Sequence, residues 1–164
     1  MQDLIASITA LGTSLMRAVH TRVDPQPIIN DPWGDSLVPE WVIEAIRQKA
    51  LSEMSTNSRA EAEAASESIV DAWLRANPAY ANVIIRSRYT EDALHAAIAR
   101  GVRQYILIGA GFDSYALRRP AEAQHVEIFE IDHPATQSFK KERLAECAIS
   151  LPGSVHFLSA DLAK

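Results

Sequence analysis

Two stretches of the chain decide its fold: Gln104-Tyr-Ile-Leu-Ile-Gly-Ala-Gly-Phe-Asp-Ser114 and Val126-Glu-Ile-Phe-Glu-Ile-Asp132. The first is an apolar run that ends in a glycine-rich turn, and the second is an apolar run that ends in a carboxylate. Glycine lets the backbone turn sharply at the end of a strand and lets a ligand approach the main chain closely. A strand, a glycine turn, a helix and a second strand tipped with Asp132 therefore predict a site for an adenosine-containing cofactor.

The elements around these stretches predict an α/β fold. Residues 105–108 form a continuous apolar run, which predicts a strand buried on both faces. A third strand is expected over residues 155–158, and a helix over residues 135–148 with Lys140, Lys141 and Glu142 on its outer side and Phe139, Leu144 and Ala148 facing inward. The order β-α-β-α-β predicts a parallel sheet with right-handed crossovers.

The first hundred residues are predicted to be mainly helical. Apolar residues at helical spacing predict a helix over residues 3–20, followed by a proline-rich loop over residues 24–35. Further helices are expected over residues 40–54, from a capping box at Ser58-Arg-Ala-Glu61, and over residues 93–100, the last closed by Gly101. We therefore divide the chain into a helical cap region, residues 1–100, and a partial Rossmann-like domain, residues 101–164.

Composition narrows the classes of function. The chain has 164 residues, enough for a domain with a real core, and a net charge of −5, which argues against nucleic-acid binding. No apolar run approaches the ~20 residues of a membrane span. The single cysteine, Cys147, and the absence of an early basic cluster favour a cytoplasmic protein without a signal peptide. The histidines have no metal-ligand spacing with Cys147, so no metal site is expected.

The strongest candidate site residues are Gly109, Gly111 and Asp132. Asp132 lies about twenty residues past the glycines, the separation at which a carboxylate accepts the hydroxyls of a ribose. The competing interpretations are an ordinary strand-to-helix turn for the glycines, and a solvated strand end or a cap for the following helix for Asp132. Glu130 points to the same side of the strand as Asp132 and is a weaker candidate. Ser114 stands where dinucleotide sites place a third glycine, which disfavours NAD.

Two further residues are open to two interpretations. Asp161 follows the third strand and could accept from an adenine amino group, or it could be a terminal turn residue. Arg88 precedes the helix predicted over residues 93–100 and could reach over the glycine turn to hold a carboxylate. It could equally be a solvated arginine or a partner for Glu91 or Asp92.

Several linked motifs resemble one family, the leucine carboxyl methyltransferase-like family of class I S-adenosylmethionine-dependent methyltransferases, and in particular its actinobacterial branch. They are Ile29-Asn-Asp-Pro-Trp33, Arg86-Ser-Arg-Tyr89, Ile108-Gly-Ala-Gly-Phe-Asp-Ser114, Phe129-Glu-Ile-Asp-His-Pro134 with the following Ala-Thr-Gln-x-x-Lys-x-x-Arg143, and Ala160-Asp-Leu162. The resemblance covers nearly the whole chain, and the motifs follow one another in the order typical of that family.

The resemblance implies S-adenosylmethionine as the cofactor and a role for each matching residue. Arg88 would bind the methionine carboxylate, Gly109 and Gly111 would pass beneath the methionine part, Asp132 would hold the ribose, and the adenine would lie between Asp161 and Leu162. One position departs from the branch, because Tyr115 stands where arginine is common, and whether Arg118 substitutes is left open. The acceptor would be a small-molecule or peptide carboxylate or hydroxyl, and no residue is assigned as a chemical nucleophile.

The resemblance also implies a sheet of seven strands, of which three are expected here. We therefore expect a fragment truncated after the third strand, whose first strand has an unpaired apolar edge that favours self-association. Such a fragment should bind cofactor poorly and show no turnover. The alternatives are a nucleotide-dependent oxidoreductase and an inactive nucleotide-binding half-domain or interaction module.

Overall fold

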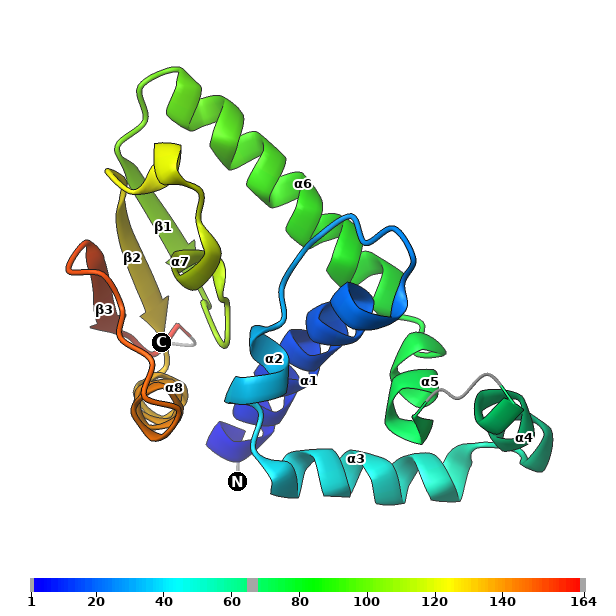
Figure 1. Cartoon of the computed structure of the whole chain (residues 1–164). Coiled ribbons are helices and arrows are strands. Elements are labelled where there is room, and N and C mark those ends of the chain that lie inside the picture. The colour runs from blue at the N-terminus through cyan, green and yellow to red at the C-terminus, as the bar shows by residue number, and fades with distance from the viewer. Residues whose placement is uncertain (1, 65–67, 163–164) are drawn as a thin grey trace.

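The structure is a computed structural model that describes residues 2–64 and 68–162. The N-terminal region is helical, with α1 (Gln2–Val23), α2 (Trp33–Leu37), α3 (Glu40–Glu53), α4 (Thr56–Ala64), α5 (Ile69–Arg75) and α6 (Tyr80–Ala99). The remainder alternates strands and helices, with β1 (Gln104–Ile108), α7 (Tyr115–Arg118), the 3₁₀ turn η1 (Ala121–Ala123), β2 (Glu127–Asp132), α8 (Pro134–Glu146) and β3 (Val155–Ser159). Figure 1 shows the sheet at one side of the molecule and the helices α1 to α5 at the other, with the long α6 reaching across.

The three strands form one parallel sheet in the order β1-β2-β3. In register, Ile106 lies opposite Phe129, which lies opposite His156, and Ile108 lies opposite Ile131, which lies opposite Leu158. This arrangement confirms the predicted α/β class and the partial Rossmann-like sheet. It also places the carboxyl ends of β1 and β2, where the candidate site residues stand, side by side at one edge of the sheet.

The expectation that β1 is buried on both faces is wrong for this structure. Tyr105 and Leu107 pack into a small core with Leu94 of α6 and Ile128 of β2. Ile106 and Ile108 point to the opposite face, where they are 56% and 72% exposed. In the part of the chain that the structure describes, β1 pairs only with β2, so its outer edge is unpaired as the sequence predicted.

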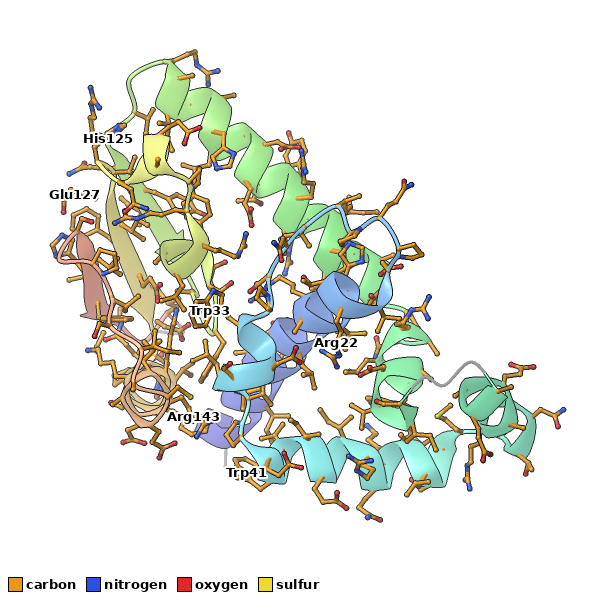
Figure 2. The ribbon with its side chains drawn as sticks, in the orientation of Figure 1. Arg22, Trp33, Trp41, His125, Glu127 and Arg143 are labelled. Atoms are coloured by element: carbon orange, nitrogen blue, oxygen red, sulfur yellow. The ribbon has the colours of Figure 1, made fainter. Side chains whose placement is uncertain are left out.

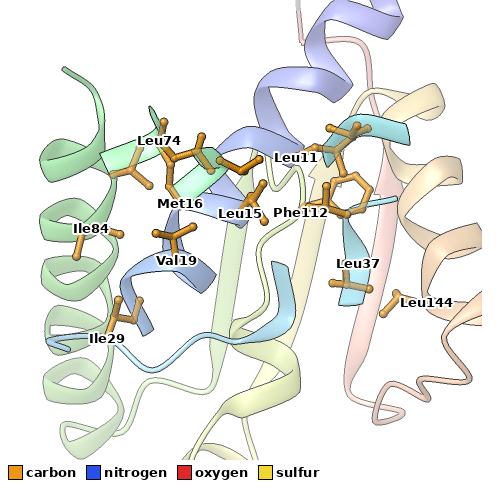
Figure 3. Close-up of a cluster of buried hydrophobic side chains, with 14 residues drawn as sticks. Leu11, Leu15, Met16, Val19, Ile29, Leu37, Leu74, Ile84, Phe112 and Leu144 are labelled. Carbon is orange, nitrogen blue, oxygen red and sulfur yellow. The ribbon is translucent and has the colours of Figure 1, made fainter. Parts of the chain in front are cut away.

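The main hydrophobic core joins the helical region to the glycine turn. Leu11, Leu15 and Val19 of α1 are almost fully buried, which confirms the helical spacing read from the sequence. Phe112, from the turn after β1, enters the same core, as Figure 3 shows. Its ring packs edge-on against Phe139 of α8, with ring centroids 5.7 Å apart. The two regions of the chain thus share one core, and a division at residue 100 stays a prediction.

The short helix α2 packs closely against α1 and α8, although the sequence predicted a loop as far as residue 35. A Cβ on Gly34 would lie 2.4 Å from the Ser14 carbonyl oxygen, so only glycine lets α2 approach α1 this closely. Arg143 of α8, labelled in Figure 2, donates to the carbonyl oxygens of Ser36 and Leu37, both at 3.0 Å. The glycine and the arginine therefore fix α2 between α1 and α8.

The single helix expected to open at Ser58 and to end at Asn77-Pro78 is two helices, α4 and α5, in the structure. The helix expected to open at Ser58 begins at Thr56, and the Ser55 hydroxyl accepts the Ser58 N–H at 3.1 Å. A separate helix, α5, opens at a second cap, where the Ser68 hydroxyl accepts the Asp71 N–H at 3.2 Å. The reason is that several Ser-x-x-acid or serine-rich segments compete as caps, and only packing selects among them.

The third difference matters most for the site. The helix predicted over residues 93–100 is the end of α6, a helix of 20 residues. Its predicted cap is confirmed, because Gly101 has φ +96° and donates its N–H to the Ile98 carbonyl. Arg86 and Arg88 therefore lie on a continuous helix and not on a loop. No described helix is both long and apolar enough to cross a membrane.

Candidate functional site

The glycine turn has the backbone conformation that its sequence predicted. Gly109 and Gly111 have φ of +72° and +53°, a region in which residues with a Cβ are strained. The N–H groups of Gly109 and Ala110 both donate to the Ile131 carbonyl of β2, at 2.9 and 3.1 Å. A Cβ on Gly111 would lie only 3.0 Å from the Cβ of Ala10, so α1 packs directly against the turn.

Asp132 is held against this turn at the end of β2. Its Oδ2 accepts the Gly111 N–H at 2.5 Å, and its Oδ1 accepts the His133 N–H at 2.6 Å. Each carboxylate oxygen can accept more than one hydrogen bond, so both retain capacity for a ligand. The carboxylate and the turn are thereby fixed as one unit, and the ribose contact predicted from the spacing of about twenty residues stays a prediction.

A cavity of about 780 Å³ opens over this unit. Its walls come from α1, the polar side of α6, β1 and the glycine turn. Its volume falls within the range of small-molecule and cofactor sites, roughly 300–1,000 Å³. The charged and polar residues that line it include Arg17, Arg86, Ser87, Thr90, Glu91, Asp113 and Asp132. The cavity can therefore accept an elongated polar ligand that carries hydroxyl groups and an anionic group.

The structure brings Gly109, Gly111 and Asp132 together but places Arg88 elsewhere. The Arg88 Nε donates to Asp92 Oδ2 at 2.9 Å, and its Nη1 donates to the Ile28 carbonyl at 2.9 Å. It borders a separate pocket of about 290 Å³. Of the two interpretations open for Arg88, the observed contact is the ion pair with Asp92, and its role in cofactor binding stays a prediction.

Arg86, which was not among the residues predicted from the sequence, lines the large cavity instead. On a helix, the side chains of residues i and i+2 point about 200° apart, so Arg86 and Arg88 cannot both face the same cavity. Among the side chains that the structure describes, none pairs with Arg86. Both arginines stand in the same motif, and reading residues 80–99 as one helix would have separated them.

Asp161 and Leu162 follow β3 at the same edge of the sheet. Ala160 donates its N–H to the Asp132 carbonyl at 2.9 Å, which ties the end of β3 to the end of β2. Asp161 is half-buried and Leu162 is exposed, and neither is among the described residues that line the large cavity. Their predicted contacts with adenine are therefore not tested by this geometry.

Glu130 is engaged in a buried ion pair with Lys140 of α8. Both side chains are 3% exposed, and the Lys140 Nζ lies 2.5 Å from Glu130 Oε2 and donates to the Asp113 carbonyl at 2.7 Å. Burial raises the pKa of Glu130, although the charge of Lys140 opposes the shift. The expectation that Lys140 lies on the outer side of the helix is wrong, because this pair pulls it inward. Ala148, expected to face inward, is exposed and lies past the end of α8 with φ +53°.

A second buried network lies on the other side of the turn. The Asp31 carboxylate, fully buried, accepts from Arg17 Nε at 2.7 Å and from the Ser114 hydroxyl at 2.5 Å. Burial alone would raise the pKa of Asp31, but the nearby Arg17 and Arg118 charges and these hydrogen bonds hold it below its usual value. Asp31 therefore stays ionised inside the protein.

The structure gives the partners of Arg118, and these contacts do not test whether it substitutes for the arginine of the branch. Arg118 donates to both carboxylate oxygens of Glu91 and, through Nε, to the Ser114 hydroxyl at 3.1 Å. Tyr115, at the position that departs from the branch, is buried, and its hydroxyl lies 3.1 Å from His95 Nε2. The described residues contain no cluster of three or more histidine, cysteine or acidic side chains that could hold a metal ion.

The chain matches the family model described as leucine carboxyl methyltransferase over residues 10–164. It is 32% identical over 162 residues to the Bacillus subtilis (strain 168) protein named "Putative S-adenosyl-L-methionine-dependent methyltransferase YktD", covering 97% of this chain and 53% of that protein. A Mycolicibacterium smegmatis protein of similar name is 33% identical over 162 residues, which are 98% of this chain and 50% of the relative.

A Mycobacterium tuberculosis (strain H37Rv) protein, Rv3399, also carries this name and is 28% identical over 98% of this chain and 43% of its own length. The chain thus spans about half the length of the curated relatives it matches. The family match includes the glycine turn, Asp132 and the strands that hold them. The chain belongs to the leucine carboxyl methyltransferase family.

Proposed function

We propose that this chain provides the cofactor-binding part of an S-adenosylmethionine-dependent methyltransferase that methylates a carboxylate or hydroxyl oxygen. The observation that carries the proposal is that the positive-φ glycine turn, Asp132, which is bonded to that turn, and Arg86 all line one cavity. The names of the relatives support the choice of cofactor, since each is described as dependent on S-adenosylmethionine.

The residues present fit such a ligand. Asp132 can accept the ribose hydroxyls while it keeps its bonds to Gly111 and His133. Arg86, which has no partner among the described side chains, can hold the methionine carboxylate in a bidentate pair. In this proposal Arg86 takes the role that the family resemblance gave to Arg88. Asp161 and Leu162 are proposed to contact the adenine, because they follow β3 at the same edge of the sheet.

S-adenosylmethionine, when bound, supplies a methyl group already activated on its sulfonium sulfur. The protein then has to hold the acceptor oxygen in line with that methyl group and exclude water, so catalysis is largely positioning. None of the residues assigned here acts as a nucleophile. The acceptor, a small-molecule or peptide carboxylate or hydroxyl, is part of the proposal, and no described residue is assigned to bind it.

The 164-residue chain by itself is proposed to bind the cofactor weakly and to show no turnover. The support is that β1 pairs only with β2 in the described part of the chain and that Ile106 and Ile108, which line the cavity, are exposed. A cavity with one open side buries less of its ligand and excludes less water.

Nuclear magnetic resonance tests the proposal even when binding is weak. The chain has six glycines, so the amide signals of Gly109 and Gly111 fall in a sparsely populated region of a nitrogen–proton spectrum. Titration with S-adenosylhomocysteine should shift these two signals and leave Gly153, in the turn before β3, unchanged. Asp132→Asn should abolish the shifts, because the Asn side chain has one accepting oxygen in place of two and cannot accept both ribose hydroxyls while it also bonds Gly111 and His133.

Two further arms separate the alternatives. Arg86→Met should weaken binding roughly tenfold or more through loss of a charge-assisted pair, whereas Arg88→Met should not. The reverse result would return the role to Arg88. Shifts that are larger with NADH than with S-adenosylhomocysteine would favour an oxidoreductase, and a stable dimer with no shift for either ligand would favour an interaction module.

A further inference from the structure

We propose that Asp31, together with Arg17 and Ser114, is a positioning element that sets the conformation of the glycine turn. Through it the N-terminal region controls the geometry of the site, although none of its helices carries the glycine motif. This inference deepens the proposed function, because a positioned turn matters when the turn binds a ligand.

The polar groups of the turn are held from three directions. Arg17 of α1 donates through Nη2 to the Phe112 carbonyl at 2.9 Å. Lys140 of α8 donates to the Asp113 carbonyl at 2.7 Å. The Ser114 hydroxyl donates to Asp31, which lies in the loop before α2, at 2.5 Å. Three successive residues after Gly111 are thus each bound to a different segment of the protein.

Asp31 joins two of these three attachments. Its Oδ2 accepts from both Arg17 Nε and Ser114, so the cation that holds the Phe112 carbonyl is itself oriented by the group that holds Ser114. The loop that carries Asp31 is fixed in turn, because the Asp31 N–H donates to the Thr21 hydroxyl of α1 at 2.7 Å. A shift of this loop would therefore move both attachments together.

A purely structural role for this network is the competing explanation. Buried ion pairs are weak evidence for stability, because replacing both partners by apolar side chains of similar size is often neutral. Their directional hydrogen bonds, however, define geometry in a way that apolar contacts do not. Removal of the whole pair therefore separates the two explanations, since it spares stability but releases the turn.

The test compares amide hydrogen exchange in the wild-type chain and in the Arg17→Met/Asp31→Leu double variant. The amides to follow are those of Gly111, which donates to Asp132, and Asp113, which donates to the Ala110 carbonyl. We expect both to exchange about tenfold faster in the variant, because local opening of the turn becomes easier, while amides in α8 keep their rates. The measurement needs no ligand, so it can fail or succeed independently of cofactor binding.

A second ion pair on α1 gives a matched control. Arg22, labelled in Figure 2, pairs with the buried Asp71 of α5 at 2.6 Å and also with the exposed Asp35 of α2, and among the described contacts none joins Arg22 or Asp71 to the turn. Arg22→Met/Asp71→Leu should leave the exchange of Gly111 and Asp113 unchanged. Equal acceleration in both double variants would overturn the proposal, as would wild-type exchange at the turn in a folded Arg17→Met/Asp31→Leu protein.

Ser114→Ala keeps the proposal testable if the double variant does not fold. It removes one hydroxyl and leaves the Arg17–Asp31 pair in place. Besides the bond to Asp31, the variant loses the Arg118 Nε contact at 3.1 Å, while Arg118 keeps its pair with Glu91. We expect about a threefold faster exchange at Asp113, confined to the turn, from the loss of the bond to Asp31. Exchange at the wild-type rate in this variant would show that Asp31 does not position the turn.

Discussion

Replacing Lys140 by methionine should destabilise the fold far more than its place on a polar-looking helix suggests. Methionine keeps much of the length of the side chain and removes its charge. In the native structure the Glu130 carboxylate is 3% exposed and lies 2.5 Å from the Lys140 Nζ. In the variant this carboxylate loses its partner. The Asp113 carbonyl, which accepts from the same amine at 2.7 Å, loses its donor as well.

The structure sets the size of the effect. Breaking a buried ion pair by removal of one partner costs about 3–5 kcal/mol. Since domains of this size have a free energy of unfolding of about 5–15 kcal/mol, the variant should lose a large share of its stability and roughly 10 °C in Tm. Lys140→Met/Glu130→Leu leaves no buried charge, and should cost only about 1 kcal/mol for the lost bond to Asp113.

Urea unfolding monitored by circular dichroism measures both variants, and pH adds a second criterion. Burial raises the pKa of Glu130 in the folded protein, so its ionisation costs stability as pH rises from the usual carboxyl range through the folded pKa. Without Lys140 the pKa rises further, and the loss in Lys140→Met should be larger at pH 8 than at pH 5. The neighbouring Lys141 is exposed, and Lys141→Met should cost less than about 1 kcal/mol.

Two results would refute this reasoning. One is a loss in Lys140→Met no larger than that in Lys141→Met, which would mean that Glu130 and Lys140 do not form a buried pair. The other is a double variant as unstable as the single one, which would assign the effect to packing of the lysine chain and not to an unpaired carboxylate.

Three further predictions concern other parts of the chain. Gly111→Ala should cost about 1–2 kcal/mol, because φ is +53° and the new Cβ would meet Ala10 at 3.0 Å. Gly12 lies within α1, and a Cβ added there would have no atom within 4 Å. Gly12→Ala should therefore stabilise the fold by about 0.5–1 kcal/mol, and thermal unfolding of the two variants checks the contrast. Ile108→Lys should change stability by less than about 0.5 kcal/mol, since the Ile108 side chain is 72% exposed. It should, however, reduce the self-association that we propose for the β1 edge left unpaired by the described residues. Unchanged sedimentation behaviour would contradict that proposal. Asp31 has a folded pKa below its usual value of 3.8, so its contribution to stability is present above that value and is lost as pH falls through the folded pKa. The stability difference between wild type and Asp31→Asn, measured by urea unfolding, should therefore shrink below about pH 4, and a constant difference would count against the assigned shift.

Much of the fold was predictable because its signals are local. The apolar run before Gly109 and the run before Asp132 each specify a strand, and positive φ at the turn explains why glycine stands there. The exposed face of β1 was not predictable in the same way, because a continuous apolar run does not say which face the rest of the chain covers. The predictions of the helix boundaries near Ser55 and Ser68 were wrong for a related reason, since several serines within a few residues can each cap a helix.

In the candidate site, too, some features follow from local sequence and others only from tertiary packing. The sequence by itself determined the glycine turn, the carboxylate at the end of the second strand and the parallel order of the strands, because strand patterns and turn residues act over a few neighbouring positions. Only the tertiary structure decided that Arg86 and not Arg88 lines the cavity, since that depends on the continuity and docking of α6.

Tertiary structure also decided that Lys140 and Asp31 lie inside. Lys140 meets Glu130 from another element, and Asp31 meets Ser114 across 83 positions of the sequence. A charged side chain is buried only where folding brings it a partner, because burying it alone is too costly. The identity of that partner is a property of the packed fold, which is why local patterns assigned Lys140 to the surface.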